Sequence, residues 1–335
     1  MSETKKTAAA ESINSVVDAA TGEFKRPAAQ FRNHISSKPG SPFPPESGRY
    51  HLYVSYACPW AHRTLIMRNL KGLQSIIDFT SVHWYMDLGG IGWRFAKADE
   101  KLSGENVTPD PVNGVETIRD LYLLAEPNYT GRFSVPVLWD KKTKTIVSNE
   151  SSEIIRMFAT EFNDLLDEDH RSINIIPNSL IASIDKMNQW IYDDINNGVY
   201  KCGIAKSQAA YEKNVTQLFD SLDRVESLLA NSTGPYILGN ELTEVDLRLY
   251  PTIVRFDVVY VTLFKTNLDT IRSGFPAIHK WLRHLYWDLP AFGQTTNFEH
   301  IKRHYFSSIT TLNPEGIVPL GPRPEILGKQ IEAVK

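Results

Sequence analysis

The residue best suited to chemistry in this sequence is Cys58, which is followed directly by Pro59. Residues 49–56 mix β-branched and aromatic side chains and predict a strand, whereas residues 60–71 have apolar residues at helical spacing. Because proline suits the first helical position, Cys58 should be the N-cap, with its sulfur facing free N–H groups. Such a setting lowers a cysteine pKa from ~8.5 to between ~3.5 and ~7.5. We therefore predict a nucleophilic thiolate, against the alternative of a buried, inert cysteine.

The position at which a second cysteine would resolve an internal disulfide is Ala61. A C-x-x-C disulfide therefore cannot form, and an external thiol must resolve any intermediate on Cys58. Glutathione is the abundant thiol of the cytosol, so it is the expected co-substrate. The other cysteine, Cys202, falls in a segment that predicts helix. We interpret Cys202 as a packing residue, although it could also act as a resolving thiol.

Two further sequence elements could bind a peptide-like thiol. A cis-proline in Val135-Pro136 would turn the backbone of Val135 toward the cysteine, where it could pair with a ligand as an added strand. An ordinary proline at a strand start is the alternative. Glu150 and Ser151 fall at a strand-to-helix junction, where free N–H groups bind a carboxylate and a glutamate can bind an ammonium group. Simple helix capping is the alternative there.

The order of the predicted elements divides the chain into two domains. Residues 48–162 read strand–helix–strand and then strand–strand–helix, an α/β thioredoxin-like domain with an insertion at about 87–130. Residues 175–308 predict an all-α domain. Residues 1–47 are interpreted as an arm over the domain surface, with disorder as the alternative, and residues 309–335 as a tail. The insertion is interpreted as a functional or covering loop because of its length.

The all-α region contains one recognisable capping arrangement. Thr243 and Asp246 are three residues apart, and Leu242 precedes them as a hydrophobic staple would. We assign this arrangement to folding rather than to chemistry. The long helical segments around it span residues 179–197, 207–230, 242–261 and 275–289.

Composition excludes several classes of function. The 335 residues are 42% hydrophobic and 22% charged, with a net charge of −3, which argues against nucleic acid or an anionic membrane as the main partner. No apolar run reaches the roughly 20 residues that a membrane span needs. Two cysteines do not make a disulfide framework, and the cores need no structural metal. The sequence thus favours a soluble cytoplasmic enzyme that uses no metal.

These motifs together resemble the glutathione transferase superfamily, and within it the xi class, the S-glutathionyl-hydroquinone reductases. The resemblance covers roughly residues 23–325. It rests on FKRPAAQFRNHIS, YVSYACPWAHRTLIMRNLKGL, GWRF, VPVLWDKKTKTIVSNESSEIIRMF, NNGVYKCG and NFEHIKRHYF.

The resemblance implies a set of site residues and a reaction. The Cys58 thiolate would take glutathione from a glutathionyl-hydroquinone, and a second glutathione would release oxidised glutathione. A homodimer is also implied. Tyr200 and Tyr305 would bind or protonate the aromatic group, with core packing as the alternative, and His62 and His304 would be structural. The implied glutathione contacts are Trp93, Arg132, Val135, Glu150 and Ser151.

Other functions use parts of the same pattern. An omega-type enzyme that reduces dehydroascorbate or mixed disulfides would share the thiol chemistry but bind a different acceptor. A protein that only stores aromatic ligands would keep the pocket and need no reactive cysteine. A membrane-inserting relative is disfavoured because the chain has no spanning apolar run.

Overall fold

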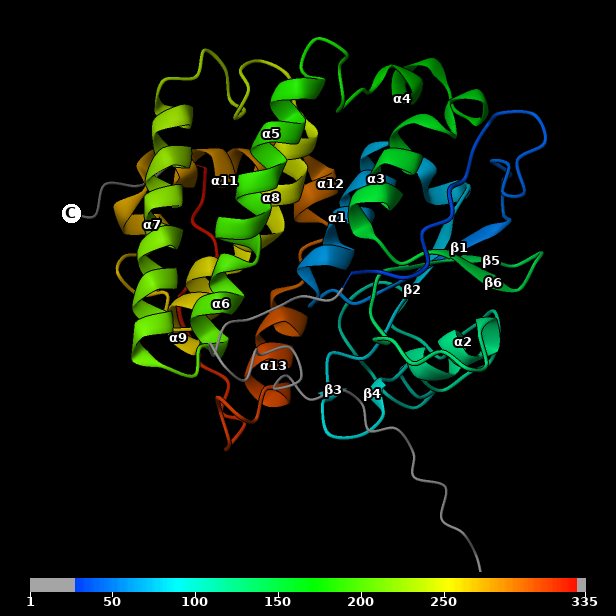
Figure 1. The fold of residues 1–335 in the computed structure, drawn as a ribbon, viewed down its shortest axis with the longest axis horizontal. Coiled ribbons are helices and arrows are strands. Elements are labelled where there is room, and N and C mark those ends of the chain that lie inside the picture. Colours follow the sequence, from blue (N-terminus) through cyan, green and yellow to red (C-terminus); the bar gives the residue numbers. More distant parts are fainter. Residues whose placement is uncertain (1–27, 330–335) are drawn as a thin grey trace, which may run out of the picture.

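A computed structural model describes residues 28–329, which form an α/β domain beside a helical domain (Figure 1). The predicted fold class is therefore confirmed. The parts of the predicted arm and tail at 1–27 and 330–335 lie outside the described residues.

The α/β domain is built on a four-stranded mixed sheet in the order β2-β1-β5-β6. The central strand β1 (Tyr50–Val54) is parallel to β2 (Asp78–Ser81) and antiparallel to β5 (Val137–Asp140). The edge strand β6 (Thr145–Ser148) is joined to β5 by the predicted hairpin. All five residues of β1 are buried, so this strand carries the core of the domain.

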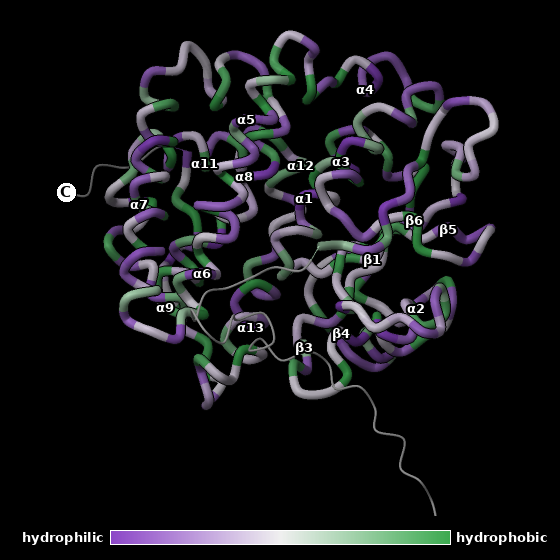
Figure 2. The backbone as a smooth tube through the Cα atoms, in the orientation of Figure 1, coloured by the Kyte–Doolittle hydropathy of each residue, from purple (hydrophilic) through white to green (hydrophobic). Residues whose placement is uncertain are grey.

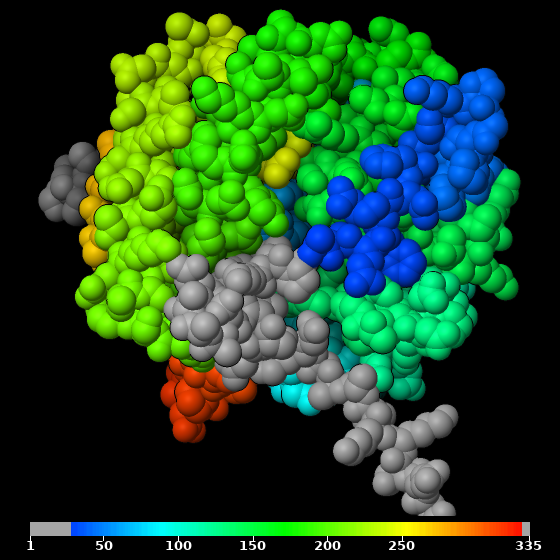
Figure 3. All heavy atoms as spheres, in the orientation of Figure 1, coloured from blue at the N-terminus to red at the C-terminus, as the bar shows by residue number. Residues whose placement is uncertain are grey.

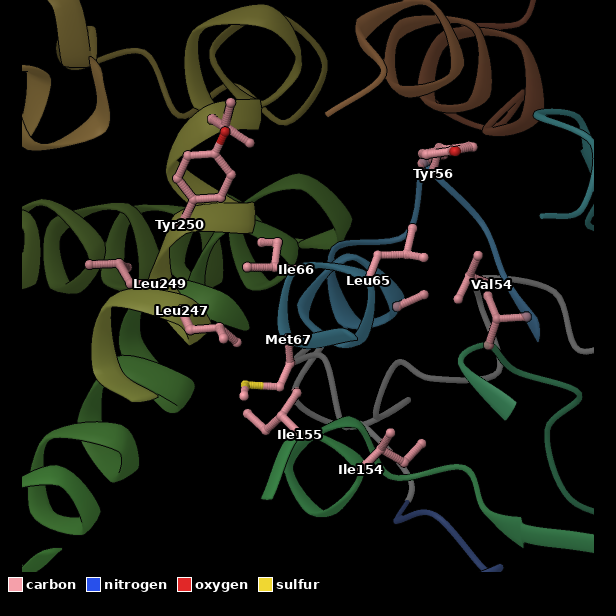
Figure 4. Packing of buried hydrophobic residues seen from close by; sticks show 14 of the residues in the cluster. Val54, Tyr56, Leu65, Ile66, Met67, Ile154, Ile155, Leu247, Leu249 and Tyr250 are labelled. Carbon is pink, nitrogen blue, oxygen red and sulfur yellow. The ribbon is translucent and has the colours of Figure 1, made fainter. Parts of the chain in front are cut away.

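Helix α1 (Pro59–Leu70) lies between the two domains. This helix packs against α3 (Ser151–Thr160) and α8 (Glu244–Arg255). In Figure 4, its residue Met67 lies beside Ile155 of α3, Ile66 lies on the side of α8, and Leu65 lies on the side of Val54 in β1. All three α1 side chains are buried. Because Cys58 immediately precedes this helix, the site stands where the two domains meet.

The insertion differs from the expected covering loop because it contains regular structure. A two-stranded ribbon of β3 (Met86–Asp87) and β4 (Gly92–Trp93) precedes a helix, α2 (Ile118–Ala125). The side chains of Thr117 and Asp120 form a capping box at the start of α2. This pattern was present in the sequence, and it is a recognised signal for a helix start.

The described part of the N-terminal arm lies on the α/β domain, as predicted. Arg32 forms a β-bridge with Ser148 of β6, and the Asn33 amide donates to the Val147 carbonyl at 2.9 Å. Figure 3 shows this blue segment on the molecular surface against the green residues of the same domain. The arm thereby covers part of the exposed edge of the sheet, which would otherwise offer unpaired backbone groups.

The helical domain contains the four long helical segments that the sequence predicts. Along α7 (Gln208–Ala230), hydrophobic and hydrophilic residues alternate (Figure 2), and the buried residues include Val215, Leu218, Leu222 and Val225 at helical spacing. The principal helices besides α7 and α8 are α5 (Ile181–Ile191), α6 (Gly198–Ile204), α11 (Pro276–Asp288) and α13 (Phe298–Ser308). Shorter helices are η2 (Leu73–Ser75), η3 (Asn163–Leu165), α4 (Glu168–Ser172), α9 (Val261–Leu263), α10 (Ile271–Gly274) and α12 (Pro290–Gly293).

Two π-helical turns interrupt this domain, and the sequence did not predict them. The first, η4 (Tyr192–Asn196), joins α5 to α6, and the second, η5 (Phe256–Tyr260), follows α8. Turns of this kind occur frequently at functional sites.

The predicted capping box at Thr243 and Asp246 is confirmed at the start of α8. Among residues 28–329, no helix is long and apolar enough to cross a membrane.

Candidate active site

Cys58 occupies the predicted place at the N-cap of α1, with Pro59 at the first helical position. Its backbone is extended, at φ −76° and ψ 119°, and its carbonyl accepts the first helical hydrogen bond from the His62 amide at 3.0 Å. The side chain is half-buried, and Sγ donates to the Val135 carbonyl at 3.5 Å. The thiol therefore stands at a helix N-terminus in a residue that is only partly buried, as its expected chemistry requires.

The peptide bond between Val135 and Pro136 is cis, and it brings Val135 to Cys58, as predicted. A network that the sequence did not reveal supports this segment. The Tyr122 hydroxyl of α2 donates to the Ser134 carbonyl at 2.9 Å, and the Asn149 amide group donates to Tyr122 at 2.9 Å. Helix α2 therefore fixes the backbone that faces the thiol.

Glu150 and Ser151 lie at the start of α3, where the sequence placed them. Oε1 of Glu150 accepts hydrogen bonds from the Ser152 amide at 3.0 Å and from the Ser152 hydroxyl at 2.8 Å. The glutamate thus caps the helix, which is the structural alternative considered from the sequence. Capping through one oxygen is compatible with ligand binding, because a carboxylate has four acceptor positions.

Trp93 and Arg132 come from the insertion and from the segment that follows it. The Trp93 ring is buried and stacks on His304 of α13, with centroids 4.7 Å apart and planes 25° apart. Burial lowers the pKa of His304 to about 4, and its Nδ1 lies 3.0 Å from the Trp84 carbonyl, so the neutral ring donates there. The Arg132 carbonyl accepts from the Ser134 amide at 3.1 Å.

Tyr200 of α6 and Tyr305 of α13 meet directly, with their hydroxyl oxygens 2.5 Å apart. Tyr260, at the end of η5, also lies against Tyr305, with 3.1 Å between the hydroxyl oxygens, and its ring centroid is 6.1 Å from that of Tyr200. Tyr260 was missed because a π turn, which has no clear sequence signature, directs it inward. The three phenols form a chain in which Tyr260 and Tyr305 are buried and Tyr200 is partly exposed.

Burial raises the pKa of both Tyr260 and Tyr305 well above the ordinary tyrosine value. Both phenols therefore stay neutral at physiological pH and can donate hydrogen bonds. The partly exposed Tyr200 is the member of the chain that can reach a ligand. The contacts thus group the predicted residues as Cys58 with Val135, Tyr200 with Tyr305, and Trp93 against the neighbour of Tyr305 on α13.

His62 is structural, as the sequence analysis expected. Its Nδ1 lies 3.1 Å from an Nη1 of Arg255, which can only donate, and its Nε2 lies 3.0 Å from the Thr295 hydroxyl. The imidazole proton must therefore be on Nε2. Burial, together with the Arg255 charge, lowers the pKa of His62 well below its usual value. A neutral ring with both nitrogens engaged is not available as a base.

Cys202 lies in the hydrophobic core on α6, and burial raises the pKa of its thiol to about 12. Neither cysteine forms a disulfide. The burial and the raised pKa of Cys202 fit a packing residue.

Within residues 28–329 there is no group of three or more metal-ligating side chains. Two surface cavities, of about 580 and 440 Å³, are lined by none of the predicted site residues.

Two family models match the chain over the parts that the fold distinguishes. Residues 57–161 match the N-terminal domain of glutathione S-transferases, and residues 208–284 match their C-terminal domain. The first match falls on the α/β domain of the structure and the second on its helical domain. The chain belongs to the glutathione S-transferase family.

The relatives of this chain indicate which class of the family it resembles. It is 53% identical to glutathione S-transferase omega-like 2 of Schizosaccharomyces pombe, with 91% of this chain and 95% of that one covered. It is 48% identical to the glutathionyl-hydroquinone reductase YqjG of Escherichia coli, over 90% and 89%. The xi-class transferase ECM4 of Saccharomyces cerevisiae, solved with glutathione, superimposes with a TM-score of 0.87 at 42% identity, covering 92% and 100%. The resemblance to the xi class is confirmed.

Proposed function

We propose that this protein reduces S-glutathionyl-hydroquinones to hydroquinones, with Cys58 as nucleophile and glutathione as co-substrate. The observation that carries the proposal is that the structure contains both a half-buried cysteine at a helix N-terminus and a cluster of three tyrosine hydroxyls. Cys58 supplies the nucleophile, and Tyr200 supplies a phenol next to Tyr305. The relatives named as glutathionyl-hydroquinone reductases support the same reaction.

The reaction has two steps. The Cys58 thiolate attacks the glutathione sulfur of the thioether, a disulfide bond forms, and the carbon–sulfur bond breaks with its electron pair going to the aromatic carbon. That carbon takes a proton from Tyr200. A second glutathione then attacks the mixed disulfide, releases Cys58, and provides the proton that restores Tyr200. In total, the aromatic carbon is reduced, and the glutathione sulfur of the thioether and one free glutathione thiol are joined in one disulfide.

The glutathione contacts follow from the chemistry of that peptide. The backbone of Val135, next to the cis-proline, would pair with the cysteinyl part of glutathione. The start of α3 at Ser151 offers N–H groups to a carboxylate, and Glu150 would bind the ammonium group. Arg132 would bind a second carboxylate, and Trp93 would pack against the ligand. Solved glutathione complexes of xi-class relatives support this part of the proposal.

A thioltransferase or dehydroascorbate reductase of the omega type is the second candidate, and the omega-like names of other relatives favour it. Glutathione oxidation measured with glutathionyl-hydroquinone, hydroxyethyl disulfide and dehydroascorbate separates the candidates. We expect the first substrate to be turned over fastest. Faster turnover of dehydroascorbate, with no reaction of the thioether, would replace our proposal by the second candidate.

The role of Cys58 has its own test. Enzyme treated with oxidised glutathione should gain one glutathione mass on Cys58, as read by mass spectrometry of peptides. Cys58→Ser should abolish turnover because a hydroxyl cannot form the mixed disulfide. Cys202→Ser is the matched control and should leave turnover unchanged. A Cys58–Cys202 disulfide would show an internal resolving step and contradict the external-thiol mechanism.

A further inference from the structure

A buried arginine of the helical domain reaches the loop that ends at Cys58. Arg255, the last residue of α8, is fully buried. Its Nε donates to the Ala57 carbonyl at 3.1 Å, and one Nη donates to the Tyr56 carbonyl at 2.8 Å. The guanidinium fork therefore holds the two residues that immediately precede the nucleophile.

No carboxylate among residues 28–329 forms an ion pair with Arg255. Its remaining partners are the Pro251 carbonyl, at 2.7 Å, and Nδ1 of His62, at 3.1 Å. Only dipoles of neutral groups therefore offset its charge, although a buried cation is ordinarily paired with an anion. A site that keeps such a cation is prepared for negative charge that appears during the reaction.

The same residue precedes Tyr260 of the tyrosine cluster by five positions. In a regular α-helix, residues five positions apart point about 140° away from each other. The π turn η5 begins directly after Arg255 and ends at Tyr260, and it narrows this angle because its hydrogen bonds span five residues. The Arg255 charge opposes the rise that burial causes in the pKa of both Tyr260 and Tyr305.

We propose that Arg255 is the cation shared by both halves of this active site. It fixes the Cys58 loop, and it favours negative charge first on the sulfur and later on the tyrosine cluster. Under the proposed function, on which this inference rests, negative charge starts on the thiolate and passes to the phenol that gives up its proton. A single buried cation that holds the Cys58 loop and whose charge acts on the phenols stabilises the negative charge at both ends of this path. Arg255 is thus a positioning residue and touches no substrate.

The titratable groups on which the Arg255 charge acts do not titrate near neutral pH. His62 of α1 and His304 of α13 are held neutral by burial, which lowers the pKa of each. Tyr250, Tyr260 and Tyr305 are held neutral because burial raises the pKa of each. A pH profile of Cys58 alkylation between about pH 5 and 9 therefore reports the thiol and not these neighbours.

The test compares Arg255→Met with Arg63→Met in the full-length protein. Arg63 of α1 is also buried and has no carboxylate partner among the described residues, but it donates into the helical domain, to Asn196 at 2.8 Å and to the Arg248 carbonyl at 3.0 Å. Both variants lose a buried cation at the domain interface, so general destabilisation is matched. We expect Arg255→Met to shift the Cys58 alkylation profile upward by about one pH unit, and Arg63→Met to shift it far less.

Alkylation needs no hydroquinone, so it can fail or succeed independently of the proposed function. An unshifted profile in Arg255→Met, or equal shifts in both variants, would overturn the proposal. The second measurement is turnover of two substrates by Arg255→Met. Reduction of glutathionyl-hydroquinone should fall at least tenfold more than reduction of hydroxyethyl disulfide, because only the former uses the tyrosines. Equal losses would refute a cation shared by both halves.

A conservative variant covers the case in which Arg255→Met does not fold. Arg255→Lys keeps the charge but loses the fork that contacts the Tyr56 and Ala57 carbonyls together. We expect its alkylation profile to stay within half a pH unit of the wild type, while kcat falls about tenfold on both substrates. Full activity of Arg255→Lys would show that the fork does not position Cys58 and would overturn the positioning role.

Discussion

The hydroxyl oxygens of Tyr200 and Tyr305 lie 2.5 Å apart, although 105 residues separate them in the chain. Tyr260 extends this contact inward, so the most buried phenol is last and the partly exposed one is first. With both buried phenols neutral, each can donate toward the next, from Tyr260 to Tyr305 and from Tyr305 to Tyr200. Such a chain polarises the outermost hydroxyl and stabilises the phenolate left after Tyr200 gives up its proton.

Removing a single hydroxyl tests this arrangement. Tyr200→Phe and Tyr305→Phe each keep the ring, and we expect turnover of glutathionyl-hydroquinone to fall ~10²-fold, the lower end for general acid catalysis. Reduction of hydroxyethyl disulfide should change little, because its leaving thiolate needs no such proton. Steady-state kinetics with both substrates measure the ratio directly.

Tyr260→Phe provides the graded comparison, because Tyr260 is fully buried and acts on the substrate only through its contacts with Tyr305 and Tyr200. A loss of no more than tenfold is expected. Equal losses on both substrates in any variant would point to a defect in folding or in glutathione binding. Unchanged kinetics in Tyr200→Phe and Tyr305→Phe would make these tyrosines packing residues.

The two cysteines should differ sharply in their reaction with iodoacetamide. Cys58 is half-buried at the N-terminus of α1, so it should alkylate readily below pH 7. Cys202 is buried, and because burial raises its pKa to about 12 it should remain unmodified in the native protein. Peptide mass spectrometry of samples quenched at several pH values gives both profiles. An apparent pKa of about 8.5 or higher for Cys58 would remove the thiolate from the proposed mechanism.

The capping box of α8 should contribute to stability and not to chemistry. The buried Asp246 carboxylate accepts from the Ile237 amide at 3.0 Å, from Trp281 Nε1 at 2.9 Å, and from both the amide and the hydroxyl of Thr243. Asp246→Ala leaves these donors buried and unpaired, so the free energy of unfolding should fall by about 3 kcal/mol or more. Thr243→Ser keeps a hydroxyl and should cost much less. Denaturant titration measures both, and equal losses would contradict this account.

Much of the fold could be predicted because its signals are local. The sheet strands, α1 and the Cys58 N-cap follow from side-chain periodicity and from the position of Pro59, and each was found within a few residues of its place. Helix α2 was missed even though Thr117 and Asp120 signal its start. The polar composition of the insertion outweighed that signal, and the few apolar residues of an eight-residue helix are a weak pattern.

The site could be predicted only where a motif is contiguous. Val135 and Glu150 follow from their neighbours in sequence, but Tyr260 and Arg255 do not. Their roles depend on the π turn between them, which changes the direction of side chains without changing the pattern of apolar residues. Contacts such as that of Arg255 with Ala57, 198 residues apart, arise from domain packing, which local patterns do not encode.

The last prediction separates the two possible roles of Glu150. Its Oε1 caps α3 through Ser152, and a glutamine side-chain oxygen can accept the same two hydrogen bonds. Glu150→Gln therefore keeps the cap and removes only the negative charge. If that charge binds the ammonium group of glutathione, the KM for glutathione should rise about tenfold or more, since a charge-assisted hydrogen bond contributes about 1.5–3 kcal/mol. The midpoint of thermal unfolding of Glu150→Gln should hardly change.

Glu150→Ala, which loses both the cap and the charge, should raise the KM for glutathione and also lower the unfolding midpoint. An unaltered KM in Glu150→Gln, with a lower unfolding midpoint in Glu150→Ala, would assign Glu150 to helix capping alone.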